Sequence, residues 1–255
     1  MPLSHAEAIY RHLVRHDLCE DLAFGLNIGF YRTFAVPEIA KVLVSTGKMN
    51  AQTELRAMTT GLMMHQLFYY GLDSEKGART VQALNRIHAR WEIGNETYLY
   101  VLACFDIAPI RWCDANAWRA TTAEEKDACH TFYCGLAERM GIRHVPPTWD
   151  EFAIWTDRYE EERFDATPES AQLWVATRGF LISRCFSAKL APLFRGASDA
   201  FLDEPLRRAF GVARPHAAAR TLAAISIRLR ARRIHRAHSA PDYQPVLPPA
   251  VRDFA

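Results

Sequence analysis

Apolar residues recur every three or four positions along most of this chain, which is the spacing of one face of an α-helix. The strongest pattern is a pair of segments at about 52–70 and 74–92, joined by a short polar turn. Helices are predicted at about 4–18, 37–43, 52–70, 74–92, 95–109, 122–140, 167–187, 206–210 and 215–238, with one more beginning at 148. The aromatic and glycine-rich segment 24–34 is predicted to be irregular or a short helix.

Capping residues and prolines set the predicted ends of these helices. Thr122 and Thr148 each stand three residues before a glutamate, which is the capping-box pattern. Gly47 and Gly141 suit C-terminal caps, and Pro109 should kink or end its helix. No segment alternates like a strand bounded by hairpin turns. The sequence therefore predicts an all-α protein with a single helical domain.

The composition is that of an ordinary globular protein. The 255 residues are 49% hydrophobic and 24% charged, enough to bury a core without a disulfide or structural metal. The formal net charge of +2 is too small to indicate nucleic acid as a partner. The N-terminus is too polar for a signal peptide, and the longest uncharged run, Ala57 to Leu72, is too short for a spanning helix. We expect a soluble, cytoplasmic protein.

Six cysteines are scattered along the chain, at 19, 104, 113, 129, 134 and 185. None forms a CxxC pair or a Cys/His cluster with zinc-finger spacing. Most of them lie in apolar surroundings, so we predict buried free thiols, which suit a reducing compartment.

His88 lies within the apolar face of the second segment of the central pair. Val81, Leu84, His88 and Trp91 fall at i, i+3, i+7 and i+10, so the imidazole should point toward the core. Such a histidine is either a core residue hydrogen-bonded to a backbone carbonyl or a neutral imidazole that binds haem iron. The spacing alone favours the first alternative, a core histidine hydrogen-bonded to a backbone carbonyl.

The first segment of the pair combines apolar side chains with a few polar ones. One face carries a second inward histidine, His65, and the neighbouring face carries Arg56, Thr60 and Met63. A haem needs this mixture, because apolar side chains pack on the ring while an arginine and a hydroxyl one turn apart can hold a propionate. The alternative is that Arg56 is solvated and Thr60 bonds back to a backbone carbonyl.

The order of these residues resembles the MpaB and rubber-oxygenase (latex-clearing protein) family. The resemblance rests on Arg56-x3-Thr60, Tyr70-Gly71 and Arg86-Ile-His88-Ala, continued by Phe30-Tyr-Arg-Thr-Phe-Ala-Val-Pro37, Val145-Pro-Pro-Thr148, Trp155-x3-Tyr159-Glu160 and Pro205-Leu-Arg-Arg-Ala-Phe-Gly211. It covers residues 24–238, between an N-terminal helix at 1–23 and an extended tail at 239–255.

The resemblance implies an all-helical domain with a globin-like core that holds haem b. By this resemblance His88 is the proximal ligand of the iron, and Arg56 and Thr60 support haem binding and activity. Met63 and His65 are expected to be further contacts of the cofactor.

The distal side of the haem differs from that of some relatives. Thr59 stands where some rubber oxygenases carry a lysine near the distal face, and we count it with His88, Arg56 and Thr60 as catalytic. An acidic residue upstream takes part in the chemistry of the family, and Glu38 and Glu54 are the nearest candidates here.

The characterised members of the family use O2 to cleave a carbon–carbon double bond in an isoprenoid chain. The resemblance therefore implies a haem-dependent dioxygenase, with O2 and an apolar alkene or terpenoid as its partners. A different class of function stays open, namely a non-catalytic helical protein that carries or senses haem or another hydrophobic ligand. No pattern indicates an oligomeric state.

Other patterns in the chain have simpler explanations. The Glu-x-x-His pairs of a di-iron bundle are absent. His130, with Cys129 and Cys134 on the same predicted helix, is best explained by core packing, and the run Tyr159–Arg163 by a solvated face. The arginine-rich last helix is either a basic solvated face or a peripheral contact with an anionic membrane.

Overall fold

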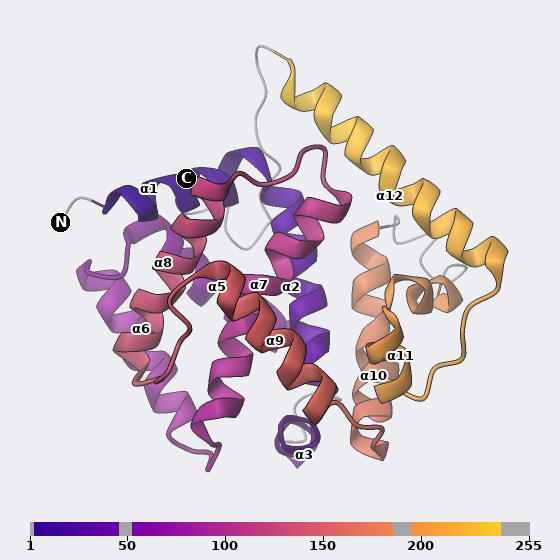
Figure 1. Cartoon of the computed structure of the whole chain (residues 1–255), viewed down its shortest axis with the longest axis horizontal. Helices are drawn as coiled ribbons and strands as arrows, with labels where there is room; N and C mark the ends of the chain where they lie inside the picture. The colour runs from indigo at the N-terminus through magenta and orange to yellow at the C-terminus, as the bar shows by residue number, and fades with distance from the viewer. Residues whose placement is uncertain (1–2, 46–52, 186–194, 241–255) are drawn as a thin grey trace.

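The computed structural model describes residues 3–45, 53–185 and 195–240, with the side chains of 3–45, 59–179 and 198–240. Every element in these ranges is helical, which confirms the all-α prediction (Figure 1). The elements are α1 (His5–His12), the π-helical turn η1 (Leu13–Asp17), α2 (Cys19–Thr33), α3 (Pro37–Ser45), α5 (Thr53–Tyr70), α6 (Glu75–His88), α7 (Asn95–Asn116), α8 (Ala123–Met140), α9 (Trp149–Arg163), α10 (Pro168–Cys185), the 3-10 turn η2 (Arg195–Phe201), α11 (Glu204–Ala209) and α12 (Ala217–His238).

The predicted helix ends are largely confirmed. Thr122 and Glu125 form a full capping box at the start of α8, and the Thr148 hydroxyl accepts the Glu151 amide at the start of α9. Gly141 ends α8 with a φ of 70°, a left-handed conformation that glycine adopts at no steric cost. Gly47 lies outside the described residues.

The structure decides two predictions about the central helices that the sequence left open. Residues 24–34, predicted to be irregular or a short helix, belong to α2, which runs unbroken from Cys19 to Thr33, and α7 does not end at Pro109 but continues to Asn116. The reason is close packing between the two helices. A Cβ added to Gly25 would lie 2.6 Å from the Pro109 Cα, and one added to Gly29 would lie 2.0 Å from the Cys104 carbonyl oxygen. Glycine is therefore required by tertiary contact here and does not mark a loop.

Helix α6 is shorter than predicted. It ends at His88, and Trp91 lies beyond the helix with 37% of its surface exposed, so it does not continue the apolar face. The Tyr98 hydroxyl donates to the His88 carbonyl oxygen at 3.1 Å. This hydrogen bond satisfies a carbonyl that the next helical turn would otherwise use.

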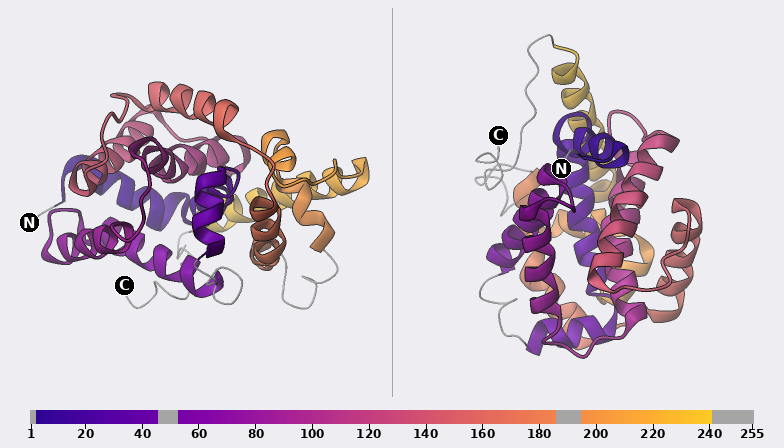
Figure 2. Two further views of the ribbon diagram at one scale, coloured as in Figure 1. Left: turned by 90° about the horizontal axis from the view of Figure 1, so that it is seen from below. Right: turned by 90° about the vertical axis from the view of Figure 1, so that its left-hand side faces the viewer.

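The buried side chains form a large cluster and two smaller ones around the central pair α2 and α7 (Figures 1 and 2). The large cluster joins α1, η1, α5, α6, α7, α8 and α9, with Leu67, Ile107 and Phe132 among its buried members. The second joins α2, α10 and α11 through side chains such as Trp174. Helix α12 lies along one edge of the molecule (Figure 1).

The cysteines whose side chains are described are free thiols, as predicted. Four of them, at 19, 104, 113 and 129, are buried, and Cys134 is partly exposed, whereas the side chain of Cys185 lies outside the described set. Within the described ranges, no helix combines the length and apolarity that crossing a membrane requires.

Candidate haem site

The site is built on the tight hairpin between α5 and α6. Gly71 ends α5 with a φ of 80°, and the Ser74 hydroxyl caps α6 by accepting the Gly77 amide at 2.9 Å. A Cβ on Gly77 would lie 2.0 Å from the Gly71 carbonyl oxygen, so only glycine allows the two helices to approach this closely. The turn chemistry thus fixes α5 and α6 as an antiparallel pair.

A side-chain hydrogen bond sets the register of this pair. The Thr80 hydroxyl donates to Gln66 Oε1 at 2.9 Å, so these two residues lie opposite one another. His88 stands about 12 Å further along α6, at 1.5 Å per residue, and is therefore level with the part of α5 that carries Thr59 and Thr60. The register brings the predicted ligand and the predicted hydroxyls to one end of the hairpin.

His88 is half-buried at the C-terminus of α6. Burial lowers the pKa of its imidazole, which is therefore neutral at pH 7, the form that binds a metal. The ring lies 5.2 Å from the ring of Tyr98, and no hydrogen bond to another described residue uses either ring nitrogen. The core-residue alternative, in which the imidazole bonds to a backbone carbonyl, has no such bond among the described residues.

A hollow of about 440 Å³ opens beside His88. Its apolar lining comes from the segment after α6 and from the end of α8, namely Trp91, Ile93, Tyr98, Met140 and Ile142. Asn85, Asn95 and Arg143 add polar groups at its edge. Among the described residues that line it, none is an aspartate or glutamate.

Residues 59–61 of α5 are open to solvent at the same level. Thr59, Thr60 and Gly61 are exposed, and a Cβ added to Gly61 would meet nothing within 4 Å. Met63 is half-buried, and from Met64 onward the helix faces the core. The side chains of Arg56 and Glu54 lie outside the described set.

His65, the second inward histidine, faces a different neighbour. It is buried, and desolvation followed by the charge of Arg15 lowers its pKa to about 4. Arg15 belongs to η1 and stacks over the Tyr69 ring, 4.5 Å from its centroid. His65 therefore lies toward η1, about one and a half turns deeper along α5 than the level of His88.

Glu38 joins the site through the first turn of α7. Its Oε2 accepts the Thr97 hydroxyl at 3.0 Å, and the next residue, Tyr98, holds the His88 carbonyl. Of the two candidate acidic residues, Glu38 has a described side chain, and it is hydrogen-bonded to the helical turn that contacts His88.

These residues fit a haem by the chemistry of their donors. A neutral imidazole at a helix end can ligate iron, and the apolar side chains in the mixed lining of the hollow beside it could pack on a porphyrin ring. The guanidinium of Arg143 at the edge of the hollow is a suitable partner for a propionate, whereas Thr59, Thr60 and Met63 of α5 are not among the residues that line it.

Residues 21–237 match the family model described as "ER-bound oxygenase mpaB/B'/Rubber oxygenase, catalytic domain". The chain belongs to this family. Among curated proteins, the chain is 23% identical over 180 residues to "ER-bound oxygenase mpaB" of Penicillium brevicompactum, covering 64% of this chain and 46% of that protein. It is 25% identical over 152 residues to the mpaB protein of Penicillium roqueforti, covering 52% of this chain and 51% of that protein. The chain thus spans about half the length of the curated relatives it matches.

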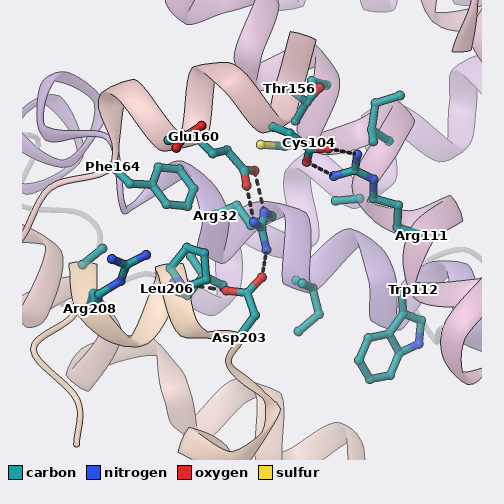
Figure 3. A pocket seen from close by; sticks show the side chains of 18 of the residues that line it. Arg32, Cys104, Arg111, Trp112, Thr156, Glu160, Phe164, Asp203, Leu206 and Arg208 are labelled. Atoms are coloured by element: carbon teal, nitrogen blue, oxygen red, sulfur yellow. Dashed lines mark hydrogen bonds and ion pairs between the residues drawn. The ribbon is translucent and has the colours of Figure 1, made fainter. Parts of the chain in front are cut away.

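A larger cavity of this oxygenase-family chain lies away from His88, between α2, α7, α9 and α11 (Figure 3). It holds about 950 Å³, and buried and paired charges line it. The Arg32 Nε donates to Glu160 Oε1 at 2.6 Å, and its Nη1 donates to Asp203 Oδ2 at 2.5 Å. The Tyr100 hydroxyl also donates to Glu160 at 2.9 Å.

This network corrects in part the prediction that Tyr159–Arg163 is a solvated face, which holds for residues 161–163 and is wrong for the first two. Glu160 is only 7% exposed and Tyr159 is buried, because the partners of Glu160 come from α2 and α7, which the local sequence of α9 does not reveal. No histidine is among the described residues that line the cavity, and burial raises the pKa of the Cys104 thiol, which stays protonated. The described lining of this cavity therefore offers no imidazole, and His88 remains the candidate ligand in spite of its smaller hollow.

His130, which the sequence assigned to core packing, is buried in a polar contact. Its Nδ1 lies 2.7 Å from Asp106 Oδ2, and its Nε2 lies 2.9 Å from the Pro146 carbonyl oxygen. Burial alone would lower the pKa of His130, but the hydrogen bonds and charge of Asp106 and Cys134 outweigh it and raise the pKa to about 10. This imidazolium joins α7, α8 and the segment before α9, and is a structural ion pair.

Helix α12 exposes Leu222, Ile225 and Leu229 at 60%, 44% and 57%. Arginines flank these side chains along the helix. Contact of this face with a membrane stays a prediction.

Sequence reasoning missed two supports of the site, Tyr98 and the pair of Glu38 with Thr97. No local pattern marks them, because their partners are distant or belong to the backbone.

Proposed function

We propose that this chain is a haem-dependent oxygenase that uses O2 to cleave or oxidise a carbon–carbon double bond in an apolar, isoprenoid-like substrate. The observation that carries the proposal is the neutral, half-buried imidazole of His88 beside an apolar hollow, in a chain of this oxygenase family. The names of the curated relatives support oxygenase chemistry.

In this proposal His88 ligates haem b within a globin-like core. The bond from Tyr98 to the His88 carbonyl holds the end of α6, and the Tyr98 ring lies beside the imidazole with ring centroids 5.2 Å apart. Thr60, with Arg56, holds the propionate edge, and Met63 packs on the ring. When bound, the haem supplies the iron that activates O2.

The remaining residues control water and protons. Trp91, Ile93, Met140 and Ile142 give the hollow apolar walls, which hold an alkene and exclude water from the reacting atoms. Thr59 supplies a hydroxyl where some relatives have a lysine. Glu38 is the candidate for holding or moving a proton, because its carboxylate is tied to the turn beside His88.

Replacing His88 by Ala tests the ligand. The purified variant should retain haem at least about tenfold less well than the wild type, with loss of the Soret band, and imidazole added during haem loading should restore it in part. His65→Gln is the matched control, because His65 lies toward Arg15, and it should keep its haem. Unchanged haem content in His88→Ala would disprove the assignment.

The competing function is that of a haem carrier or sensor without catalysis. It is favoured by the absence of a carboxylate from the described lining of the hollow at His88. O2 consumption by the haem-loaded protein with a panel of terpenoid alkenes decides between the two. An oxygenase forms aldehyde or ketone products in proportion to O2, whereas a carrier binds the alkenes and forms none.

A further inference from the structure

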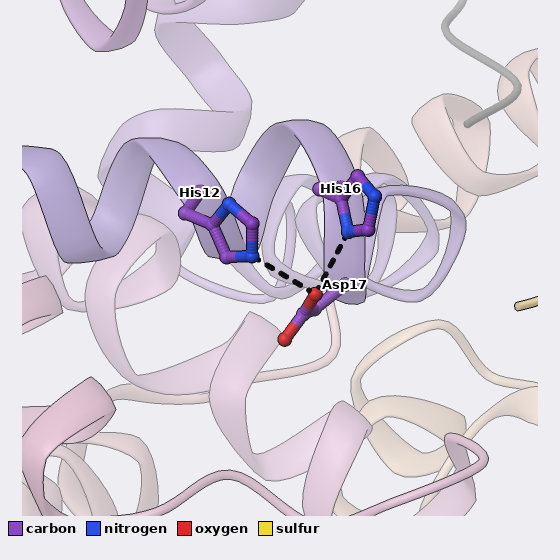
Figure 4. Close-up of side chains that lie close together, drawn as sticks. All are labelled: His12, His16 and Asp17. Atoms are coloured by element: carbon purple, nitrogen blue, oxygen red, sulfur yellow. Dashed lines mark hydrogen bonds and ion pairs between the residues drawn. The ribbon is translucent and has the colours of Figure 1, made fainter. Parts of the chain in front are cut away.

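A cluster of metal-ligating side chains lies at the π-helical turn η1, distant in sequence from His88 (Figure 4). His12, His16 and Asp17 each offer a ligand atom, and these atoms all lie within 4.8 Å of one another. Figure 4 shows both imidazoles directed at the carboxylate of Asp17. The haem site uses none of these residues.

The π turn is what brings the three side chains together. The Leu18 amide bonds to the Leu13 carbonyl at 3.0 Å, five residues back, which widens the turn. In an α-helix, at about 100° per residue, His12 and Asp17 would point roughly 140° apart. The extra residue in the turn rotates Asp17 back toward the histidine pair, which is spaced i and i+4.

The distances from the Asp17 carboxylate to the imidazole nitrogens are close to those between two ligands of one tetrahedral ion. His16 Nδ1 lies 3.0 Å and His12 Nε2 lies 3.2 Å from Asp17 Oδ1. His238, from the end of α12, brings its Nε2 within 3.8 Å of the same oxygen. Ligands about 2.0–2.1 Å from a tetrahedral zinc ion are separated by about 3.3 Å, which lies within this range.

We propose that His12, His16, Asp17 and His238 form a zinc-type divalent metal site that fastens the end of α12 to η1. Three imidazoles and one carboxylate are the donors that zinc and its transition-metal neighbours prefer, whereas calcium and magnesium prefer oxygen.

Neighbouring groups hold the ligands in place. Arg119 donates to the other carboxylate oxygen of Asp17 at 2.7 Å, and it is itself paired with Glu125. Burial would raise the pKa of Asp17, but the bonds from His16 and Arg119 outweigh it and lower the pKa, so Oδ1 is ionised and faces the histidines. The Trp118 ring packs 4.7 Å from the ring of His238.

Solvent reaches the site past two of its histidines. The side chains of His12 and His16 are 65% and 41% exposed, while those of Asp17 and His238 are 20% and 19% exposed. An ion can therefore enter past the two exposed imidazoles. The cation of Arg119 opposes a second positive charge nearby, so micromolar rather than nanomolar affinity is expected.

The same distances are also compatible with a metal-free cluster in which protonated histidines pair with Asp17. The metal site and the metal-free cluster predict different zinc contents. The purified full-length protein is dialysed against low-micromolar Zn²⁺, and zinc and iron are measured separately by mass spectrometry. The proposal expects about one zinc per chain in addition to any haem iron, bound at least about tenfold more weakly in His16→Ala and Asp17→Asn. His5→Ala is the control, because His5 is an exposed histidine of α1 outside the cluster, and it should bind zinc normally.

His12→Gln keeps the test valid if the other variants fold poorly, because its side chain is largely exposed. It should also bind zinc at least about tenfold more weakly. Amide hydrogen exchange tests whether zinc holds the end of α12 against η1. Zinc should slow exchange of the backbone amides at the end of α12 in the wild type and not in His238→Ala. A wild type that retains no zinc, or His12→Gln and His16→Ala proteins that retain as much as wild type, would overturn the proposal.

Discussion

At the scale of single residues, the same side chain takes different chemical states in this protein according to what surrounds it. His88 has only burial acting on it, so its pKa falls and the ring is neutral. His130 meets Asp106 in the core, and its pKa rises to about 10. The first state suits a metal ligand and the second suits a structural cation, and the apolar pattern along the helix distinguishes neither.

The buried pair of His130 and Asp106 predicts how stability depends on pH. The pKa of His130 is raised from about 6.5 in the unfolded chain to about 10, so its contribution to stability is complete below about pH 6.5 and is lost as the pH rises through 10. Desolvation also raises the pKa of Asp106, which acts in the same direction in the acid range. The free energy of unfolding, measured in urea, should therefore fall between pH 6.5 and 10.

The variant His130→Gln isolates this effect. It should be less stable at pH 7, and its stability should change less between pH 7 and pH 10 than that of the wild type. His5→Gln changes an exposed histidine and should leave the wild-type pH dependence intact. Equal slopes for His130→Gln and the wild type would show that this pair does not titrate as described.

At the scale of elements, the contact between α2 and α7 decides the centre of the fold. Both helices carry residues that disfavour helices, namely Gly25 and Gly29 in α2 and Pro109 in α7. Their complementarity explains why both helices persist, since the glycines let the backbone of α7 approach. Tertiary contact therefore outweighs local preference in this pair of helices.

Gly29→Ala tests this contact. The new Cβ would lie 2.0 Å from the Cys104 carbonyl oxygen, so the helices must move apart, and we expect a loss of about 2–3 kcal/mol or more in the free energy of unfolding. Gly179→Ala in α10 is the matched control, because its Cβ would meet nothing within 4 Å. The control should gain roughly 0.4–1 kcal/mol from reduced unfolded-state entropy. Similar stabilities for the two variants would argue against glycine-dependent packing.

At the scale of the whole molecule, buried ion pairs connect parts of the chain that are far apart in sequence. Arg32 of α2 meets Glu160 of α9 and Asp203 just before α11. Arg230 of α12 pairs with Asp21 of α2. These contacts join the edge helices to the central pair, and they rest on buried charges that lose their compensation when one partner is removed.

Glu160→Gln tests the first of these connections. Arg32 then keeps only Asp203 as an ionic partner, and we expect a loss of about 3–5 kcal/mol in urea unfolding. Asp203→Asn, at a half-exposed carboxylate, should cost about 1 kcal/mol. Replacing both Arg32 and Glu160 by Met should restore much of the stability. A Glu160→Gln protein as stable as Asp203→Asn would contradict this account of the network.

The sequence by itself determined the helices, most of their caps and the central hairpin of α5 and α6, because these depend on local periodicity and on residues such as Thr122, Gly141 and Gly71. It also indicated His88 as the candidate ligand through the order of its motifs. Only the tertiary structure decided which inward histidine lies beside the hollow, that Glu38 is bonded to Thr97, and that Glu160 is buried. The physical reason is that burial, partners and pKa values depend on side chains from distant parts of the chain. The cluster at η1 is the clearest case, since its fourth candidate ligand comes from the last helix.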